Sequence, residues 1–177
     1  MHKTFKEFVF KNPYANTNYQ RDGTMDIENI VIREAVNKDL EGVIDVLKST
    51  KISEEIWKGD EKWVKKTLQK SLTTENSAFL VAEINQRIVG FVNYVIYPSF
   101  WECENQGLIN DLFVHEAFQG KGIGGKLIEV VVERADARGL GELHVSTGWE
   151  NTKARRLYAK HGFIEEQPSL ERARKDM

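Results

Sequence analysis

The sequence predicts an α/β or α+β sandwich built on a mixed β-sheet. Two observations lead to this prediction. Short apolar runs typical of strands alternate with amphipathic stretches at helical spacing, and the last third of the chain has the order of β-α-β crossings. A chain of 177 residues is long enough for one domain with a substantial core. We expect that domain at 29–177, after an N-terminal extension at 1–28.

The first half of this domain is expected to form a strand, two helices and a hairpin. The second helix is expected to be capped by Asp60 and to bury Trp57 and Trp63. Asn85 and Gln86 make a connection of hairpin length between two apolar runs. The expected ranges are 29–35 for the first strand, 37–50 and 60–72 for the helices, and 78–84 and 87–97 for the hairpin strands.

The second half is expected to follow a loop and then alternate strands with helices. Gly139 and Gly141 are placed to end the first of these helices, and Asn151 or Thr152 to cap the second. The expected ranges are 98–107 for the loop, 108–114, 142–147, 163–166 and 169–177 for strands, and 123–138 and 150–162 for helices.

Composition excludes several classes of protein. The net charge of −2 lacks the basic footprint of a nucleic-acid-binding protein. No apolar run is long enough to span a bilayer, and the first residues lack the pattern of a signal peptide. The single cysteine, Cys103, excludes an intrachain disulfide and a multi-cysteine zinc site. We therefore expect a cytoplasmic protein without a metal, a nucleic-acid partner or a membrane partner.

A glycine-rich stretch, "QGKGIGGKLIE" at 119–129, follows an expected strand and opens an expected helix. Glycines let backbone N–H groups converge, and a helix start adds positive potential, so the stretch predicts a diphosphate site. Three phosphate-binding patterns fit it: G-x-G-x-x-G from Gly120, most of the P-loop G-x-x-x-x-G-K, and Q-x-x-G-x-G from Gln119.

Two of the three patterns lack their usual companions. A P-loop carries Ser or Thr after its lysine, where this chain has Leu127. A dinucleotide site has an acid at the far end of the next strand, whereas Glu142 stands at the near end. Those features disfavour an ATP site and an NAD site.

The third pattern has a second motif downstream. The stretch "NTKARRLYAKHGF" at 151–163 has the form N-x-x-A-x-x-L-Y-x-x-x-G-F. With both motifs in this order, the chain resembles the GNAT superfamily of N-acetyltransferases over about 29–166. The finer resemblance is to small-amine and polyamine acetyltransferases and to their histone-acetylating or D-amino-acid-acetylating relatives. It implies a mostly antiparallel central sheet flanked by helices.

The resemblance also implies a cofactor and the residues that hold it. Acetyl-CoA would place its pyrophosphate on the amides of the glycine loop, and its pantetheine would bind the main chain of the strand before it. Direct transfer to a small-molecule amine acceptor needs no metal, and a homodimer is implied. The implied cofactor-binding residues are Leu112, Phe113, Val114, Gln119, Gly120, Lys121, Gly122, Ile123, Gly124, Gly125, Asn151 and Tyr158.

The catalytic residues are implied in part. Tyr158 resembles the family's tyrosine that protonates the departing thiolate. Many relatives carry an acidic base on the central strand, where this chain has Asn110 and, one position on, Asp111. A shift of one residue turns a strand side chain to the other face unless a bulge intervenes. Glu102, Glu104 and His115 stay open as alternatives for the base.

An aromatic and acidic group is expected to bind the acceptor. Ring faces and carboxylates suit a cationic amine such as a polyamine, an amino sugar or a protein lysine. The alternative is a non-catalytic module that binds acyl-CoA as a sensor or scaffold, which would need the loop but not Tyr158. The expected acceptor-binding residues are Tyr94, Tyr97, Trp101, Glu102 and Glu104.

Overall fold

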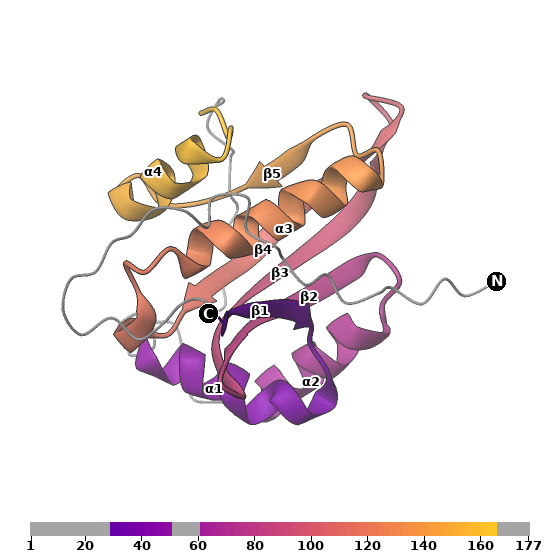
Figure 1. Ribbon diagram of the computed structural model, residues 1–177. Coiled ribbons are helices and arrows are strands. Elements are labelled where there is room, and N and C mark those ends of the chain that lie inside the picture. The colour runs from indigo at the N-terminus through magenta and orange to yellow at the C-terminus, as the bar shows by residue number, and fades with distance from the viewer. Residues whose placement is uncertain (1–28, 51–60, 166–177) are drawn as a thin grey trace, which may run out of the picture. The chain divides into compact units, whose positions relative to one another are not determined.

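The structure, a computed structural model, describes residues 29–50 and 61–165 (Figure 1). The expected extension at 1–28, the Asp60 cap, Trp57 and the strand at 169–177 lie outside these residues. The chain divides into two compact units at Ser146. None of the described helices has the length and apolar character needed to cross a membrane.

The first unit contains a five-stranded sheet in the order β1-β2-β3-β4-β5. Neighbouring strands are antiparallel from β1 to β4, and β5 is parallel to β4, which confirms the mixed, mostly antiparallel sheet. Asn85 and Gln86 both have positive φ, 48° and 65°, as a two-residue hairpin turn requires. The strands are β1 (Val31–Glu34), β2 (Ser77–Ile84), β3 (Arg87–Ser99), β4 (Glu104–Val114) and β5 (Leu143–Val145).

Helices cover both faces of this sheet. On one face, Val43 of α1 (Leu40–Ser49) and Leu68 of α2 (Glu61–Thr73) pack with Phe79 and Phe91 from the strands. On the other face, a Cβ at Gly90 would touch Ile123 and Leu127 of α3 (Ile123–Ala137). The glycine therefore lets α3 lie close against β3. The amphipathic patterns of the three helices are explained by the burial of their apolar sides against the sheet.

The second unit holds α4 (Thr152–Lys160). Asn151 caps it, because its Oδ1 accepts a hydrogen bond from the Ala154 N–H at 3.2 Å. The predicted strand at 163–166 is wrong over Phe163–Glu165, which are not in a strand. The Phe163 N–H bonds the Tyr158 carbonyl at 3.2 Å and the Glu165 carboxylate binds Arg155, so this segment closes the helix instead.

Two further expectations need correction. The loop expected at 98–107 is mostly strand, because β3 runs to Ser99 and β4 starts at Glu104, leaving 100–103 as the turn. Backbone pairing between the two strands overrides the local preference of its proline and glycine. Trp63 was expected to be buried, yet it is 63% exposed on α2.

Candidate active site

The central strand β4 carries a bulge at Asn110. Asp111 is the partner of Asn93 on β3, and Ile109 is the partner of Tyr94, so Asn110 is the extra residue. A bulge bends the strand and re-aims the side chains beside it. Asp111 stands on the α1–α2 face, since the next pair of that face, Phe91 and Phe113, packs in the α1–α2 core.

The bulge also marks the point where β4 and β5 part. The parallel pairing runs from Gly107–Leu143 to Ile109–Val145 and ends there. Among the described residues, 110–114 have no strand partner on the β5 side. An unpaired strand edge offers backbone N–H and C=O groups to an extended ligand.

The glycine loop follows β4 directly and ends at the N-terminus of α3. Gly120 and Gly122 have φ of 76° and 82°, values that L side chains rarely adopt. A Cβ on either residue would meet nothing within 4 Å, so open space lies over the loop. The first turn of α3 holds no acidic residue, and Gly122 has no side chain to cap it. The first N–H groups of a helix have no partner within that helix, and with open space in front of them they fit a diphosphate.

Side chains next to the loop fix its position. Gln119 donates from Nε2 to the Val114 carbonyl oxygen at 3.0 Å, which ties the loop to the end of β4. Phe118, in the short 3-10 helix η4 (Glu116–Phe118), is buried at 5% exposure. The Lys121 ammonium lies 5.2 Å from the centroid of this ring. The loop is therefore anchored to the domain on both sides of Gly120.

Asp111 is open to solvent, and the pKa of its carboxyl is raised. Its side chain keeps contact with solvent, yet burial by the surrounding protein raises the pKa of its carboxyl above the ordinary 3.8. A carboxylate with a raised pKa that solvent can reach is suited to accept a proton.

Asn110 is held by a second asparagine. Its Nδ2 donates to Oδ1 of Asn93 at 3.3 Å, and Asn93 in turn donates to the Ala78 carbonyl oxygen at 3.1 Å. At the bulge, Asn110 and Asp111 both lie next to the buried Asn93.

Tyr158 and Asn151 belong to the second unit. Tyr158 is 9% exposed and packs edge-on against Phe163 at 5.5 Å between ring centroids. Burial raises the pKa of its phenol above 10.0, so the hydroxyl keeps its proton at neutral pH. Asn151 is engaged as the cap of α4.

Of the expected acceptor-binding residues, four lie around the turn between β3 and β4, away from the bulge: Tyr97, Trp101, Glu102 and Glu104. Trp101 and Glu102 lie in the exposed turn between β3 and β4, and the Glu104 carboxylate packs against Gly141. From Glu104 to Asp111 the strand runs for about 23 Å, at about 3.3 Å per residue. A small amine at the bulge therefore cannot touch the turn.

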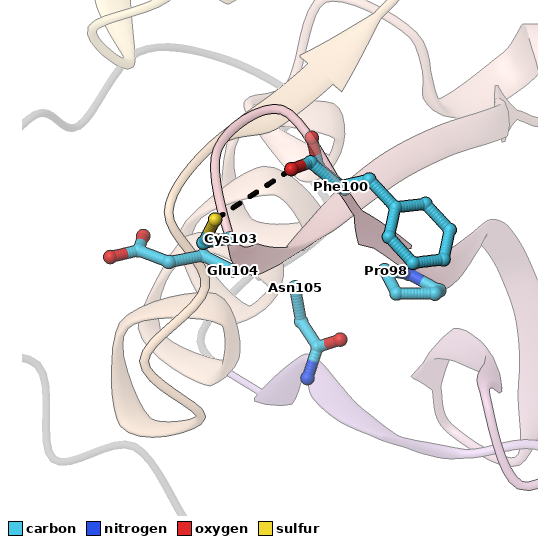
Figure 2. Close-up of a pocket in the computed structure, with 6 residues that line it drawn as sticks. Pro98, Phe100, Cys103, Glu104 and Asn105 are labelled. Carbon is cyan, nitrogen blue, oxygen red and sulfur yellow. Dashed lines mark hydrogen bonds between the residues drawn. The ribbon is translucent and has the colours of Figure 1, made fainter.

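The same turn borders a shallow hollow of about 340 Å³ (Figure 2). The Cys103 thiol points back toward the Phe100 carbonyl across the turn, at 3.6 Å. The hollow lies at the end of β4 opposite the glycine loop, so it is separate from the site at the bulge. Its lining residues are Pro98, Ser99, Phe100, Cys103, Glu104 and Asn105.

Tyr94, expected to bind the acceptor, is enclosed, and His115, an alternative for the base, is bonded to protein groups. Tyr94 is fully buried, so its ring faces are not open to a cation, and its hydroxyl has no hydrogen-bond partner among the described residues. His115 accepts from the Ala117 N–H at Nδ1 (3.2 Å), and its Nε2 lies 3.0 Å from Arg87 and 3.6 Å from Asp45. Both ring nitrogens of His115 are therefore occupied by protein groups.

Comparison with known proteins decides the family. The family model described as Acetyltransferase (GNAT) family matches residues 41–163, which include the bulge, the glycine loop and α4. The chain belongs to the GNAT acetyltransferase family. It is thus an N-acetyltransferase of the kind that uses acetyl-CoA, and this favours the third of the three phosphate-binding patterns.

Three acetyltransferases are similar to this chain in sequence. An uncharacterized N-acetyltransferase of Bacillus subtilis, YhfO, is 34% identical over 56% of this chain and 66% of its own length. The D-amino-acid N-acetyltransferase HPA3 of Saccharomyces cerevisiae is 39% identical over 42% of this chain and 47% of its own. The spermine/spermidine N(1)-acetyltransferase of Bacillus subtilis is 30% identical over 43% and 52%. The chain therefore spans about half to two thirds of the length of these relatives.

Solved structures confirm the GNAT fold. The crystal structure of a transcriptional regulator from Bacillus halodurans C-125 superimposes with a TM-score of 0.75. It covers 82% of this chain and 99% of its own, at 23% identity. At this identity the likeness concerns the fold alone.

One residue beside the bulge, Asn93, was not predicted from the sequence to contact the site candidates. Asn93 is the only amide in the otherwise apolar and aromatic run "IVGFVNYVIY". A single amide in a buried strand needs hydrogen-bond partners, which was the available signal.

Proposed function

We propose that the chain transfers the acetyl group of acetyl-CoA directly to a primary amine, either of a small cationic molecule or of a lysine or N-terminus. The observation that carries the proposal is Asp111, a solvent-accessible carboxylate with a raised pKa beside the bulge that opens the β4 edge. A module that only binds acyl-CoA has no use for a proton acceptor at this place.

The loop and the strand edge are proposed to hold acetyl-CoA, which supplies an acetyl group activated as a thioester. The N–H groups of Gly120–Gly125 and of the α3 N-terminus bind the pyrophosphate. Main-chain groups of Leu112, Phe113 and Val114 bind the pantetheine, and one of their N–H groups stabilises the charge that develops on the carbonyl oxygen.

Two side chains are proposed to move protons. Asp111 accepts a proton from the acceptor ammonium, which frees the nitrogen lone pair. Tyr158 holds a proton for the departing thiolate sulfur, and burial of its phenol keeps that proton in place. An acid and a base in these roles typically contribute 10²–10⁴-fold each.

The acceptor amine is proposed to carry a positive charge before it reacts. The carboxylate at the bulge attracts an ammonium group. The yeast relative is an acetyltransferase of D-amino acids and one Bacillus subtilis relative acetylates spermine and spermidine, so both act on small amines. The implied homodimer stays a prediction, which sedimentation equilibrium tests.

The alternative is a non-catalytic module that binds acyl-CoA as a sensor or scaffold. The open space over Gly120 and Gly122 would serve such a module equally well.

The test is thiol release from acetyl-CoA with four amines: spermidine, D-lysine, glucosamine and a lysine-containing peptide. We expect release with at least one amine, an acetylated product by mass spectrometry, and loss of release in Tyr158→Phe. Tight CoA binding without release for any amine supports the sensor instead.

A further inference from the structure

Two asparagine side chains form a hydrogen-bonded chain from the interior of the sheet to the bulge. Asn93 is 7% exposed, and its Nδ2 donates to the Ala78 carbonyl oxygen at 3.1 Å, with Ser77 Oγ at 3.4 Å. Its Oδ1 accepts from Nδ2 of Asn110 at 3.3 Å. The chain thus runs from Ala78 through Asn93 to Asn110.

The first member of this chain fixes the direction of the other two. A backbone carbonyl oxygen only accepts hydrogen bonds, so Ala78 requires the Nδ2 of Asn93. The Oδ1 of Asn93 then faces Asn110, which must present its own Nδ2. The two ends of a carboxamide point apart, so the Oδ1 of Asn110 is turned away from Asn93.

The burial of Asn93 makes this orientation persistent. An exposed amide can flip and bond water, but a buried one that flips leaves donors and acceptors unpaired. Asn110 itself is exposed, so its Oδ1, which has no hydrogen-bond partner among the described residues, is open to a ligand. A fixed acceptor atom thus lies on the bulge beside Asp111.

We propose that Asn93 is a positioning residue for acetyl transfer: it orients the Asn110 carboxamide so that Oδ1 accepts a hydrogen bond from the incoming amine. This role rests on the proposed function. A primary ammonium carries three N–H bonds. When one proton passes to Asp111, a bond from a second N–H to Asn110 sets the direction of the freed lone pair.

A double-mutant cycle tests this role. The probe is spermidine, or whichever of the four screened amines gives the highest rate. Asn93→Ala is expected to lower kcat/KM for the amine at least tenfold and to change the KM for acetyl-CoA less than twofold. In the Asn110→Ala background, the same substitution is expected to change kcat/KM less than twofold, because the group it positions is gone.

The matched control is Ser77→Ala, which removes the long contact at 3.4 Å and keeps the Ala78 bond. It is expected to change kcat/KM less than twofold. Equal losses from Asn93→Ala in both backgrounds, or no loss in either, overturn the role, since a general structural defect acts regardless of Asn110.

A second readout covers loss of folding. If Asn93→Ala melts below the assay temperature, Asn93→Ser takes its place in the cycle. The serine side chain is polar, but it is too short to reach Asn110. In ¹⁵N spectra, the Asn110 side-chain NH₂ gives two proton signals, one for each N–H bond. In either Asn93 variant, the two signals are expected to approach each other, because the hydrogen bond to Asn93 is lost. Unchanged signals contradict the role.

Failure of the inference differs from failure of the proposed function. No transfer to any of the four amines by the unmodified protein removes the proposed function and this role with it. Transfer by the unmodified protein, with no coupling between Asn93 and Asn110, removes this role alone.

Discussion

Asp111 lies directly opposite Asn93 in the β3–β4 ladder, whereas the next pair joins Tyr94 to Ile109 and omits Asn110. This one-residue offset lies where the β5 pairing ends. It places a carboxylate with a raised pKa beside a strand edge that is open to a ligand.

Asp111→Asn is expected to raise the melting temperature at pH 7 by about 1–3 °C, a small change because solvent screens this charge. Burial raises the folded-state pKa, so the carboxyl contributes stability that is complete below its ordinary 3.8 and is lost as pH rises through the folded value. At neutral pH the charge is therefore unfavourable, and Asn removes it. Thermal melts from pH 3.5 to 8 measure the effect.

The matched control is Glu129→Gln, which changes an exposed carboxylate in the middle of α3. As a surface substitution, it is expected to leave the melting temperature at pH 7 nearly unchanged. A lower melting temperature of Asp111→Asn at pH 7 contradicts the assignment, since it means that the ionised carboxylate is stabilised by a partner.

Gly122→Ala is expected to weaken CoA binding about tenfold or about 1.4 kcal/mol. The residue has φ of 82°, so a Cβ costs about 1–2 kcal/mol in the backbone, and it projects into the open space over the loop. Gly139→Ala is the control, because Gly139 also has positive φ and open space but ends α3. Calorimetry should find similar destabilisation in both and weaker CoA binding only in Gly122→Ala.

Tyr158→Phe is expected to lower kcat about 10²-fold and leave the KM for acetyl-CoA within twofold. The substitution keeps the buried ring and its contact with Phe163 and removes only the proton donor. Initial rates across pH 6–9 check it. A fall in melting temperature that matches the loss of rate points instead to a packing role.

Tyr94→Phe is expected to stabilise the protein by about 1 kcal/mol. The buried Tyr94 hydroxyl has no hydrogen-bond partner among the described residues, and an unpaired buried hydroxyl costs about 1–3 kcal/mol. The amine KM should stay unchanged, since the ring is enclosed. Denaturant melts measure the first quantity and initial rates the second. A raised amine KM would instead return Tyr94 to the acceptor site.

The sequence predicted the elements of the sheet well where local pattern and burial agree. The runs that became β2 and β3 are almost continuously apolar, α3 is amphipathic, and both motifs of the family lie intact in the sequence. The turn at Asn85 and Gln86 was predictable because its length alone selects a hairpin.

The rest depended on contacts that a sequence does not display. The register that leaves out Asn110 is set by pairing with β3, so neither the bulge nor the role of Asn93 shows in β4 alone. The distance between the expected acceptor-binding residues and the bulge has a related cause. The paired strands β3 and β4 continue past Tyr94 and place Trp101 and Glu102 at the far turn.

The most direct test of the central claim, that the glycine loop binds CoA, is a set of thermal melts with acetyl-CoA, CoA, ATP and NAD added separately. A ligand at 100 times its Kd stabilises by about 2.7 kcal/mol, a shift of about 5 °C or more for a chain of this size. We predict this shift with acetyl-CoA and CoA and none with ATP or NAD. A shift with ATP or NAD and none with CoA would contradict the account.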